Sequence, residues 1–108
     1  MTEDANDAHT GRLKGALFTE CAEWIWEQLQ EEDGIFVAGE LIELILKTER
    51  EMGIHADSLD RIVTVVDDEF KIRGIGGSPS PVDSQMIRAV LEWEDEFLGL
   101  AALSRSES

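Results

Sequence analysis

The residue types that most often carry out chemistry are scarce in this chain. It contains two histidines, His9 and His55, a single cysteine, Cys21, and no tyrosine. Their spacing does not match the ligand spacings of a zinc site. The sequence also contains no recognisable Ser/His/Asp or Cys/His motif for nucleophilic catalysis. A single cysteine excludes an internal disulfide and is typical of a reducing compartment. Cys21 is therefore predicted to be a small apolar residue of the core.

Carboxylates are abundant, but their spacing does not predict a catalytic or metal site. They cluster at residues 31–33, 67–69 and 92–96. Consecutive acids on a helix point in different directions, so they do not converge on one ion. None of the clusters follows the spaced pattern of a calcium loop that ends in a bidentate glutamate. We therefore expect solvated acidic surface, no enzyme activity, and no bound cofactor or metal.

Charge is the strongest overall signal in the sequence. The chain has 24 acidic and 9 basic residues and a net charge of −15, and only the segment 71–91 is net positive, at +2. Three interpretations are open. The acidity can serve solubility and repel nucleic acid. It can also attract a basic protein partner or mimic a nucleic acid, or it can reflect a salt-loving host, since arginine outnumbers lysine.

The sequence shows no signal for a membrane or for export. It contains no run of about 18 apolar residues, the length that a membrane-spanning helix needs. The first twelve residues, "MTEDANDAHTGR", lack the basic and apolar regions of a signal peptide. We therefore expect a cytoplasmic protein that makes no membrane contact.

The hydrophobic pattern predicts a single, mainly α-helical domain over residues 12–100. Apolar residues make up 43 % of the chain, enough for a core. Residues 1–11 and 101–108 are small and polar without a period, so we expect flexible ends. Between them, apolar residues recur at three- and four-residue spacing and predict four helices. These helices cover about residues 13–32, 39–52, 58–68 and 81–98.

The first two predicted helices each end at a glycine. Gly34 and Gly53 stand where a C-terminal cap is expected. In the first helix, Trp24 and Trp26 flank Ile25 on either side, so they are predicted to seal the edges of the buried stripe. The inner face of the second helix is predicted to consist of Leu41, Ile42, Ile45 and Met52.

The segment that follows Gly53 fits two structures. Asp57 can cap a helix on which every third or fourth residue from Leu59 to Phe70 is apolar. The stretches "RIVTVV" and "FKIRGI" are instead rich in β-branched residues and fit two strands. We expect a helix over about 58–68 and an extended piece over 70–75, with a short β-hairpin near 62–75 as the open alternative.

A glycine- and proline-rich segment precedes the last helix. Ser80, Pro81 and Asp83 have the types and spacing of an N-cap, a first-turn proline and a capping-box acid. These three residues are therefore predicted to start the helix and not to bind a ligand.

The last helix carries two neighbouring apolar stripes. The second stripe, Ile87, Leu91 and Leu98, is wider than one packing face usually needs. If it is exposed, it suits a homodimer through the last helix or another partner. If the helix is central, the other helices cover the stripe.

The stretch "LILKTEREMGIHADSLDRIV" resembles the helix-turn-helix and winged-helix superfamily over about residues 43–63. Gly53 stands at the turn, Ile54 at the apolar position after it, and Leu59 and Ile62 at the inward positions of the second helix. The family usually has a small residue four positions before the turn glycine, and this sequence has Glu49 there. The resemblance implies a helical scaffold whose second helix can face DNA, followed by a strand pair that forms a wing.

Carried over to this chain, the resemblance gives a set of nucleic-acid-binding residues. The outward face of the second helix has one arginine and two aspartates, and carboxylates repel the phosphates that a DNA reader approaches. Base edges are read mainly by Arg, Lys, Asn and Gln. These charges argue against nucleic acid as the partner. In this alternative the binding residues are His55, Ser58, Arg61, Lys71 and Arg73.

Two acidic stretches, "EWIWEQLQEED" and "EWEDEF", interleave aromatic residues with carboxylates. Such a surface suits a protein partner with basic residues around apolar pockets. We therefore expect a small acidic, non-enzymatic regulator or adaptor that acts by protein–protein interaction. The alternatives are a helix-turn-helix transcriptional regulator and an acidic nucleic-acid mimic that inhibits a DNA- or RNA-binding protein. The predicted partner-binding residues are Trp24, Trp26, Glu27, Trp93, Glu94 and Phe97.

Overall fold

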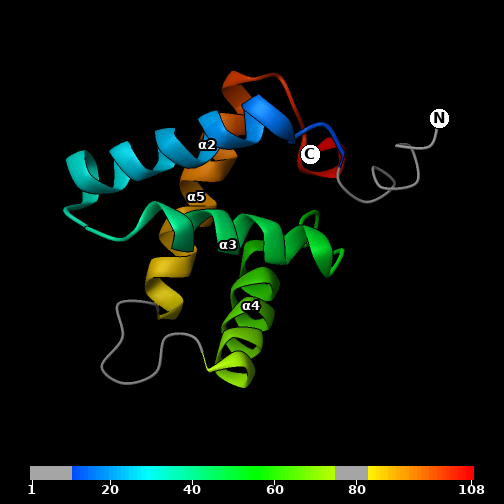
Figure 1. Cartoon of the computed structure of the whole chain (residues 1–108). Helices are drawn as coiled ribbons and strands as arrows, with labels where there is room; N and C mark the ends of the chain where they lie inside the picture. Colours follow the sequence, from blue (N-terminus) through cyan, green and yellow to red (C-terminus); the bar gives the residue numbers. More distant parts are fainter. Residues whose placement is uncertain (1–10, 75–82) are drawn as a thin grey trace.

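The computed structural model describes residues 11–74 and 83–108, and this part of the chain is mainly helical with no β-strand. The predicted class, a small four-helix domain, is confirmed. In chain order the elements are α2 (Gly15–Gln28), a π-helical turn η1 (Leu29–Asp33), α3 (Gly39–Glu51), α4 (Leu59–Arg73), α5 (Ser84–Leu100) and a short 3₁₀ turn η2 (Arg105–Glu107) (Figure 1).

Helix α5 contacts the other three long helices, as α3 does, and packs most extensively against α4 and α2. In Figure 1, α2 and α3 cross α5 one above the other, and α4 lies beside the first half of α5. The core between them is formed by the apolar stripes that the sequence pattern indicates. Its largest fully buried apolar side chains are Leu13, Ile25, Leu29, Ile42, Ile45, Leu46, Ile62, Phe70, Ile87, Leu91 and Leu98.

The end of α3 is a Schellman turn, as the Gly53–Ile54 pair predicts. The N–H of Gly53 donates to the carbonyl of Arg50 (3.0 Å), and the N–H of Ile54 donates to the carbonyl of Glu49 (2.9 Å). Gly53 has φ = +71°, a conformation that glycine adopts without a steric cost. Met52, predicted on the inner face, is instead 40 % exposed, because the helix ends there and turns the chain away from the core.

The third predicted segment is one continuous helix, so the β-hairpin near 62–75 and the extended piece over 70–75 are wrong. Ile62, Val66 and Phe70 are buried on one face of α4. Burying such a side chain contributes roughly 1.5–3 kcal/mol, which outweighs the few tenths by which β-branched residues disfavour a helix. The N-cap is Ser58, which accepts from the N–H of Arg61 (3.3 Å), and not Asp57.

The start of α5 also differs from the expectation. Asp83 is its N-cap, because its carboxylate accepts a hydrogen bond from the N–H of Met86 (2.8 Å). The predicted cap Ser80 and the predicted first-turn residue Pro81 lie outside the described residues. Asp83 thus has the capping role that the sequence reading gave to Ser80.

The second apolar stripe of α5 is covered by the chain itself. Ile87, Leu91 and Leu98 are buried within the single chain, because α5 packs against α2, α3 and α4. The premise for a homodimer through the last helix, an exposed stripe, is therefore wrong.

The C-terminal segment folds back onto the domain, where a flexible tail over 101–108 was expected. Leu103 and Ser108 are buried, and the N–H of Arg12 donates to the carbonyl of Glu107 (2.7 Å). A Cβ on Gly11 would lie 2.4 Å from the carbonyl carbon of Ser108, so only glycine allows this approach. The polar composition of the tail concealed these contacts.

The turn that sends the tail back contains a strained residue. Ala102 has φ = +60° and lies in a Schellman turn in which the N–H of Leu103 donates to the carbonyl of Leu98 (2.8 Å). The left-handed region costs a non-glycine residue roughly 1–2 kcal/mol. We therefore expect Ala102→Gly to raise the free energy of unfolding by about 0.5–1 kcal/mol, after the greater freedom of glycine in the unfolded chain is subtracted.

Urea denaturation followed by circular dichroism measures this change. Ala16→Gly, at an exposed position in the first turn of α2, is the control, and we expect it to destabilise the fold by up to about 1 kcal/mol. A loss of stability in Ala102→Gly as large as in the control would contradict the strained turn.

Candidate protein-interaction groove

Three of the predicted partner-binding residues form an aromatic cluster between α2 and α5. The rings of Trp24 and Trp93 meet edge to face with centroids 5.7 Å apart, and Trp24 lies 6.0 Å from Phe97. All three side chains are half-buried. The indole N–H of Trp93 also donates to Asp33 (2.8 Å), which ties α5 to the turn η1. The cluster therefore holds helices together, as rim tryptophans do.

Glu94 is not on the surface, which corrects its prediction as a partner-binding residue. Its side chain is fully buried, as is that of Glu49, while Arg50 is buried and Arg105 half-buried. We call these four residues the ionic cluster. Its shortest contact joins Arg50 Nη2 to Glu94 Oε2 at 2.6 Å. The i, i+4 periodicity of α5 indicates that position 94 faces inward, but the surrounding run of acids concealed it.

Two arginines from different segments, Arg50 at the end of α3 and Arg105 in the C-terminal tail, contact the two glutamates of the ionic cluster. Arg105 Nη2 lies 2.8 Å from Glu94, and Arg105 Nη1 lies 3.2 Å from Glu49. Arg50 lies 3.0 Å from Glu49 and also donates to the carbonyl (3.1 Å) and the hydroxyl (2.7 Å) of Ser108. Glu49, which stands where the helix-turn-helix pattern has a small residue, thus lies between two guanidinium groups.

The two carboxyl groups of the ionic cluster differ in pKa. Burial, and after it the charge of Glu94, raises the pKa of Glu49 well above 4.5. Burial acts to raise the pKa of Glu94 too, but Arg50, a hydrogen bond from Glu49 and Arg105 together lower it. Of the two carboxyl groups, Glu49 is therefore the one that keeps its proton to higher pH. Burial followed by the charge of Glu94 raises the pKa of the Cys21 thiol to about 12, so Cys21 is a core thiol and not a nucleophile.

An open groove of about 760 Å³ lies between α2 and α3. Its wall on α2 carries Trp26, whose indole N–H donates to the carbonyl of Val37 (3.0 Å) and so fixes the ring. Phe36 in the α2–α3 link is 74 % exposed, and Trp26 is 39 % exposed. We call it the α2–α3 groove. Its described lining residues are Ala22, Glu23, Trp26, Glu27, Gln30, Phe36, Val37, Ala38, Gly39 and Glu43.

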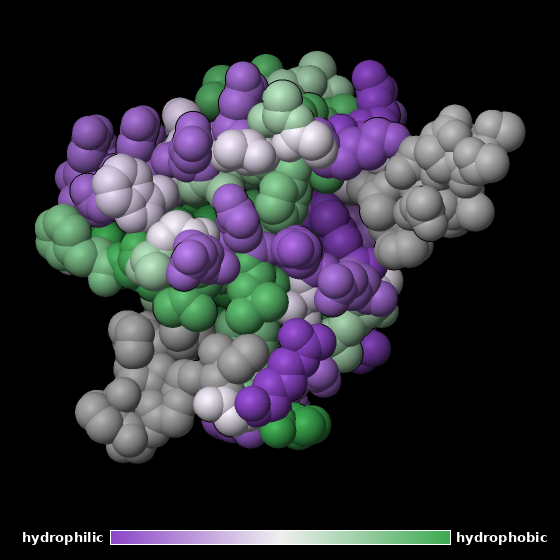
Figure 2. Space-filling view, viewed as in Figure 1, coloured by the Kyte–Doolittle hydropathy of each residue, from purple (hydrophilic) through white to green (hydrophobic). Residues whose placement is uncertain are grey.

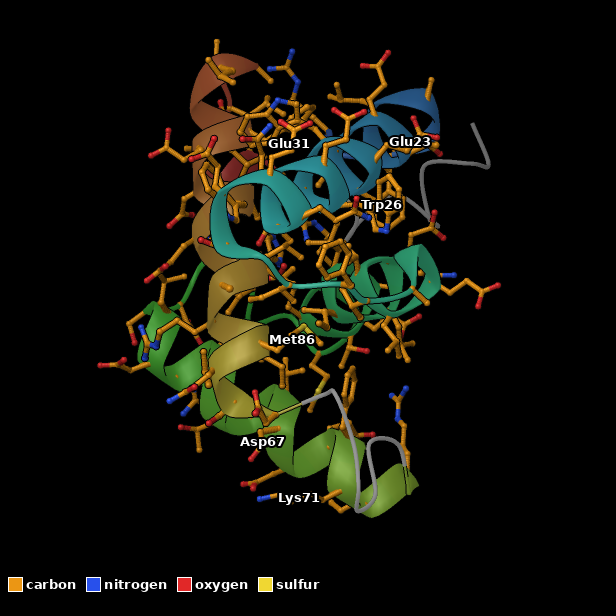
Figure 3. All side chains as sticks on the ribbon, turned by 90° about the vertical axis from the view of Figure 1, so that its left-hand side faces the viewer. Glu23, Trp26, Glu31, Asp67, Lys71 and Met86 are labelled. Atoms are coloured by element: carbon orange, nitrogen blue, oxygen red, sulfur yellow. The ribbon has the colours of Figure 1, made fainter. Side chains whose placement is uncertain are left out.

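The charge of the α2–α3 groove is negative on both walls. Glu23 and Glu27 project from α2 and Glu43 from α3, and none of the described lining residues is basic. Figure 3 shows Trp26 and Glu23 on the same side of α2, with Trp26 between α2 and α3. In Figure 2 the visible face is mostly hydrophilic, and apolar side chains emerge near the link between α2 and α3. The groove therefore combines exposed aromatic surface with acceptor groups.

Two of the predicted partner-binding residues, Trp26 and Glu27, lie in this groove. The sequence pattern does not indicate Phe36, because this residue stands in the short connection between the first two predicted helices. A single aromatic residue in a short link gives no periodic signal of exposure.

The predicted nucleic-acid surface is largely neutralised by ion pairs within α4 and its N-terminal turn. Arg61 pairs with Asp57 (2.8 Å). Lys71 pairs with Asp67 (3.0 Å) and Arg73 with Glu69 (2.8 Å), each one helical turn away, and Figure 3 shows the first of these two pairs. Ser58 is the N-cap of the helix, and no strand pair exists in the described residues to form a wing. Burial, followed by the charge of Arg50, lowers the pKa of His55, so its ring is neutral at pH 7.

We expect duplex DNA to bind no more tightly than about 10⁻⁴ M at physiological salt, the weak end of non-specific affinity. The paired cations offer few free charges to phosphates, and lowering the salt lengthens the screening distance of the net negative charge. Fluorescence anisotropy of a random duplex over a salt titration measures this. Binding in the micromolar range that Arg61→Ala, Lys71→Ala or Arg73→Ala weakens would contradict this expectation.

The described residues contain no group of three or more His, Cys, Asp or Glu side chains that could hold a metal ion. Within residues 11–74 and 83–108, no helix is long and apolar enough to cross a membrane. Comparisons of the chain with family models, with curated proteins and with solved structures find no match.

Proposed function

We propose that this protein is a small acidic regulator or adaptor without enzymatic activity, which acts by binding another protein through the α2–α3 groove. The observation that carries the proposal is the pair of exposed aromatic side chains, Phe36 and Trp26, within a groove rimmed by three glutamates. Aromatic side chains at the centre of a polar rim are the usual anatomy of a protein interface.

The chemistry of the remaining titratable groups supports a binding role over a catalytic one. Two carboxyl groups with a shifted pKa, Glu49 and Glu94, are fully buried and lie between arginines. The thiol of Cys21 is buried and its pKa is raised. Groups that no substrate reaches stabilise the fold and do not act on a substrate.

We expect wild-type protein immobilised on beads to retain a partner from an extract of its own host, and the Phe36→Ala variant to lose it. Ile72→Ala is the matched control, since Ile72 is an equally apolar side chain on α4 and is 80 % exposed. The retained protein is identified by mass spectrometry, purified and titrated. We expect Phe36→Ala to weaken the Kd by about tenfold or more and Ile72→Ala by less than about twofold. Equal affinities for both variants would contradict the proposal.

A further inference from the structure

We infer that the α2–α3 groove binds a basic amphipathic helix, with an apolar stripe on Trp26 and Phe36 and cations on both sides of that stripe. This inference rests on the proposed function and specifies the chemistry of the partner. It follows from three features of the groove: the placement of its carboxylates, its shortage of hydrogen-bond donors, and its length.

The carboxylates lie on both sides of the aromatic surface. Glu23 and Glu27 come from α2, and Glu43 comes from the opposite wall on α3. A helix with one apolar stripe presents flanking side chains on both sides of that stripe. Lysine or arginine at these flanks would meet a carboxylate on each wall. Nucleic acid has the wrong charge for this groove.

The side chains that line the groove offer few hydrogen-bond donors beyond the amide of Gln30, and this favours a helix over an extended peptide. The three glutamates, when ionised, only accept hydrogen bonds. The indole N–H of Trp26 is already used by the carbonyl of Val37 (3.0 Å). An extended or polyproline segment needs donors along its length for its own carbonyls. In a helix the backbone N–H and C=O groups bond to one another, so a bound helix needs only side-chain contacts from the groove.

The spacing on α2 matches the contact length of a short helix. Glu23, Trp26 and Glu27 follow the i, i+3, i+4 pattern and so share one face of α2, and Gln30 in the turn η1 lines the same groove. This stripe is about 10 Å long at 1.5 Å per residue, or two helical turns. Two turns of a partner helix place two or three apolar side chains over Trp26 and Phe36.

The chain's own first ten residues do not have the chemistry of this occupant. They contain three carboxylates and no lysine or arginine. They would add negative charge to a groove that already carries three glutamates. The occupant is therefore a segment of another protein.

The test uses synthetic peptides of about 14 residues, near the length at which isolated helices begin to form. The first peptide contains leucine and lysine in a helical pattern. The second has the same composition in strict alternation, and the third replaces every lysine with glutamate. Isothermal titration calorimetry measures each Kd. Nitrogen-15 NMR follows the three indole N–H signals, assigned by substitution of each tryptophan.

We expect the helical basic peptide to bind about tenfold or more tightly than either of the others and to shift the Trp26 indole signal. Phe36→Ala should weaken it by about tenfold or more, and Ile72→Ala by less than about twofold. The triple variant Glu23→Gln/Glu27→Gln/Glu43→Gln should weaken binding and reduce its salt dependence. The control triple variant, with the same change in net charge at exposed sites outside the groove, should bind nearly as wild type; it is Glu51→Gln/Asp68→Asn/Glu96→Gln.

Equal weakening by the two triple variants, or equal affinity of the alternating and helical peptides, would overturn the inference. The partner retained from the host extract distinguishes a failure of this inference from a failure of the proposed function. If that partner depends on Phe36 while the helical basic peptide does not bind the groove, the inference fails and the proposed function stands. If neither binds through Phe36, both fail.

Discussion

The double variant Glu49→Gln/Glu94→Gln is expected to lose about 3–5 kcal/mol of unfolding free energy at neutral pH. This is the cost of leaving buried charges without their partners. Glu94 lies 2.6 Å from Arg50 and 2.8 Å from Arg105, and Glu49 lies 3.0 Å and 3.2 Å from the same two guanidinium groups. When both carboxyl groups are amides, no side chain within the ionic cluster balances the two cations.

The single variants are expected to differ from each other and from the double variant. Burial and the charge of Glu94 raise the pKa of Glu49, which favours its neutral form near pH 5, and an amide resembles that form in size and charge. Glu49→Gln should therefore change stability by less than about 1 kcal/mol near pH 5. Glu94→Gln should cost about 1–3 kcal/mol, less than the double variant, because Glu49 can then ionise and balance the arginines. The singles are thus expected to be non-additive.

The protonation of Glu49 also gives a pH dependence with a definite sign. Its pKa is raised in the folded protein, so its contribution to stability is complete below 4.5 and is lost as the pH rises toward the folded pKa. Relative to Glu49→Gln, the wild type should lose up to about 1.4 kcal/mol of unfolding free energy per pH unit in that window. Glu94 has a lowered pKa, and its contribution is lost at acid pH instead.

Urea denaturation curves from pH 4.5 to pH 8 measure both effects. Glu96→Gln, an exposed acid on the same helix, is the control and should stay within about 0.5 kcal/mol of wild type. A difference between wild type and Glu49→Gln that does not change with pH would show that Glu49 is ionised in the folded protein. A double variant as stable as wild type would show that the arginines need no counter-ion.

Arg105→Met is expected to cost about 3–5 kcal/mol and to release the C-terminal segment. Arg105 contacts Glu49, Glu94 and Asp95, and it donates to the carbonyls of His55 (2.8 Å) and Leu91 (3.2 Å). The planar guanidinium group of Arg105 thus connects the turn after α3, the middle of α5 and the tail. Methionine keeps most of the volume but removes the charge and every donor.

Hydrogen exchange provides the second readout of this variant. The amide of Leu103 donates to the carbonyl of Leu98 in α5, and the amide of Ser108 donates to the carbonyl of Ser104 in the tail. Both should exchange much faster than the amides of α3. Arg88→Met is the matched control, because Arg88 pairs with the exposed Asp60 and such a pair contributes at most about 1 kcal/mol. Similar losses in both variants, or unchanged exchange at Leu103, would contradict the role of Arg105.

Local features of the sequence determined where α2 and α3 lie. Their apolar residues recur with the helical period, and two glycines adopt the left-handed conformation: Gly34 ends the turn η1 that continues α2, and Gly53 follows the end of α3. Such features depend on residues within one or two turns of each other, so a sequence pattern contains them. The same holds for the buried Cys21, which lies on the apolar stripe of α2.

The sequence left the segment after Gly53 undecided between a helix and a hairpin. The β-branched residues of "RIVTVV" favour strands locally, and only the burial of Val63 and Val66 against the other helices selects α4. The sequence pattern also predicted the start of α5 a few residues too early, since Ser80 and Asp83 are both residue types that commonly serve as helix N-caps. Local propensity differences are smaller than the energy of burial, so the packing decides.

The lining of the α2–α3 groove was only partly predictable from residue types. The interleaving of aromatic residues and acids pointed to Trp26 and Glu27, which line this groove. The same rule included Glu94, which is buried, and omitted Phe36, which is exposed. Residue type alone does not say which face of a helix another helix covers.

The sequence by itself thus determined the helical class, the glycine turns at Gly34 and Gly53 and the overall negative charge, because these depend on short-range pattern and composition. The tertiary structure decided which ionisable groups are inside. Glu49 on α3, Glu94 on α5 and Arg105 in the tail come together only in the fold, where Arg105 lies 2.8 Å from Glu94 and 3.2 Å from Glu49. These partners come from separate segments, so no local pattern contains their contacts.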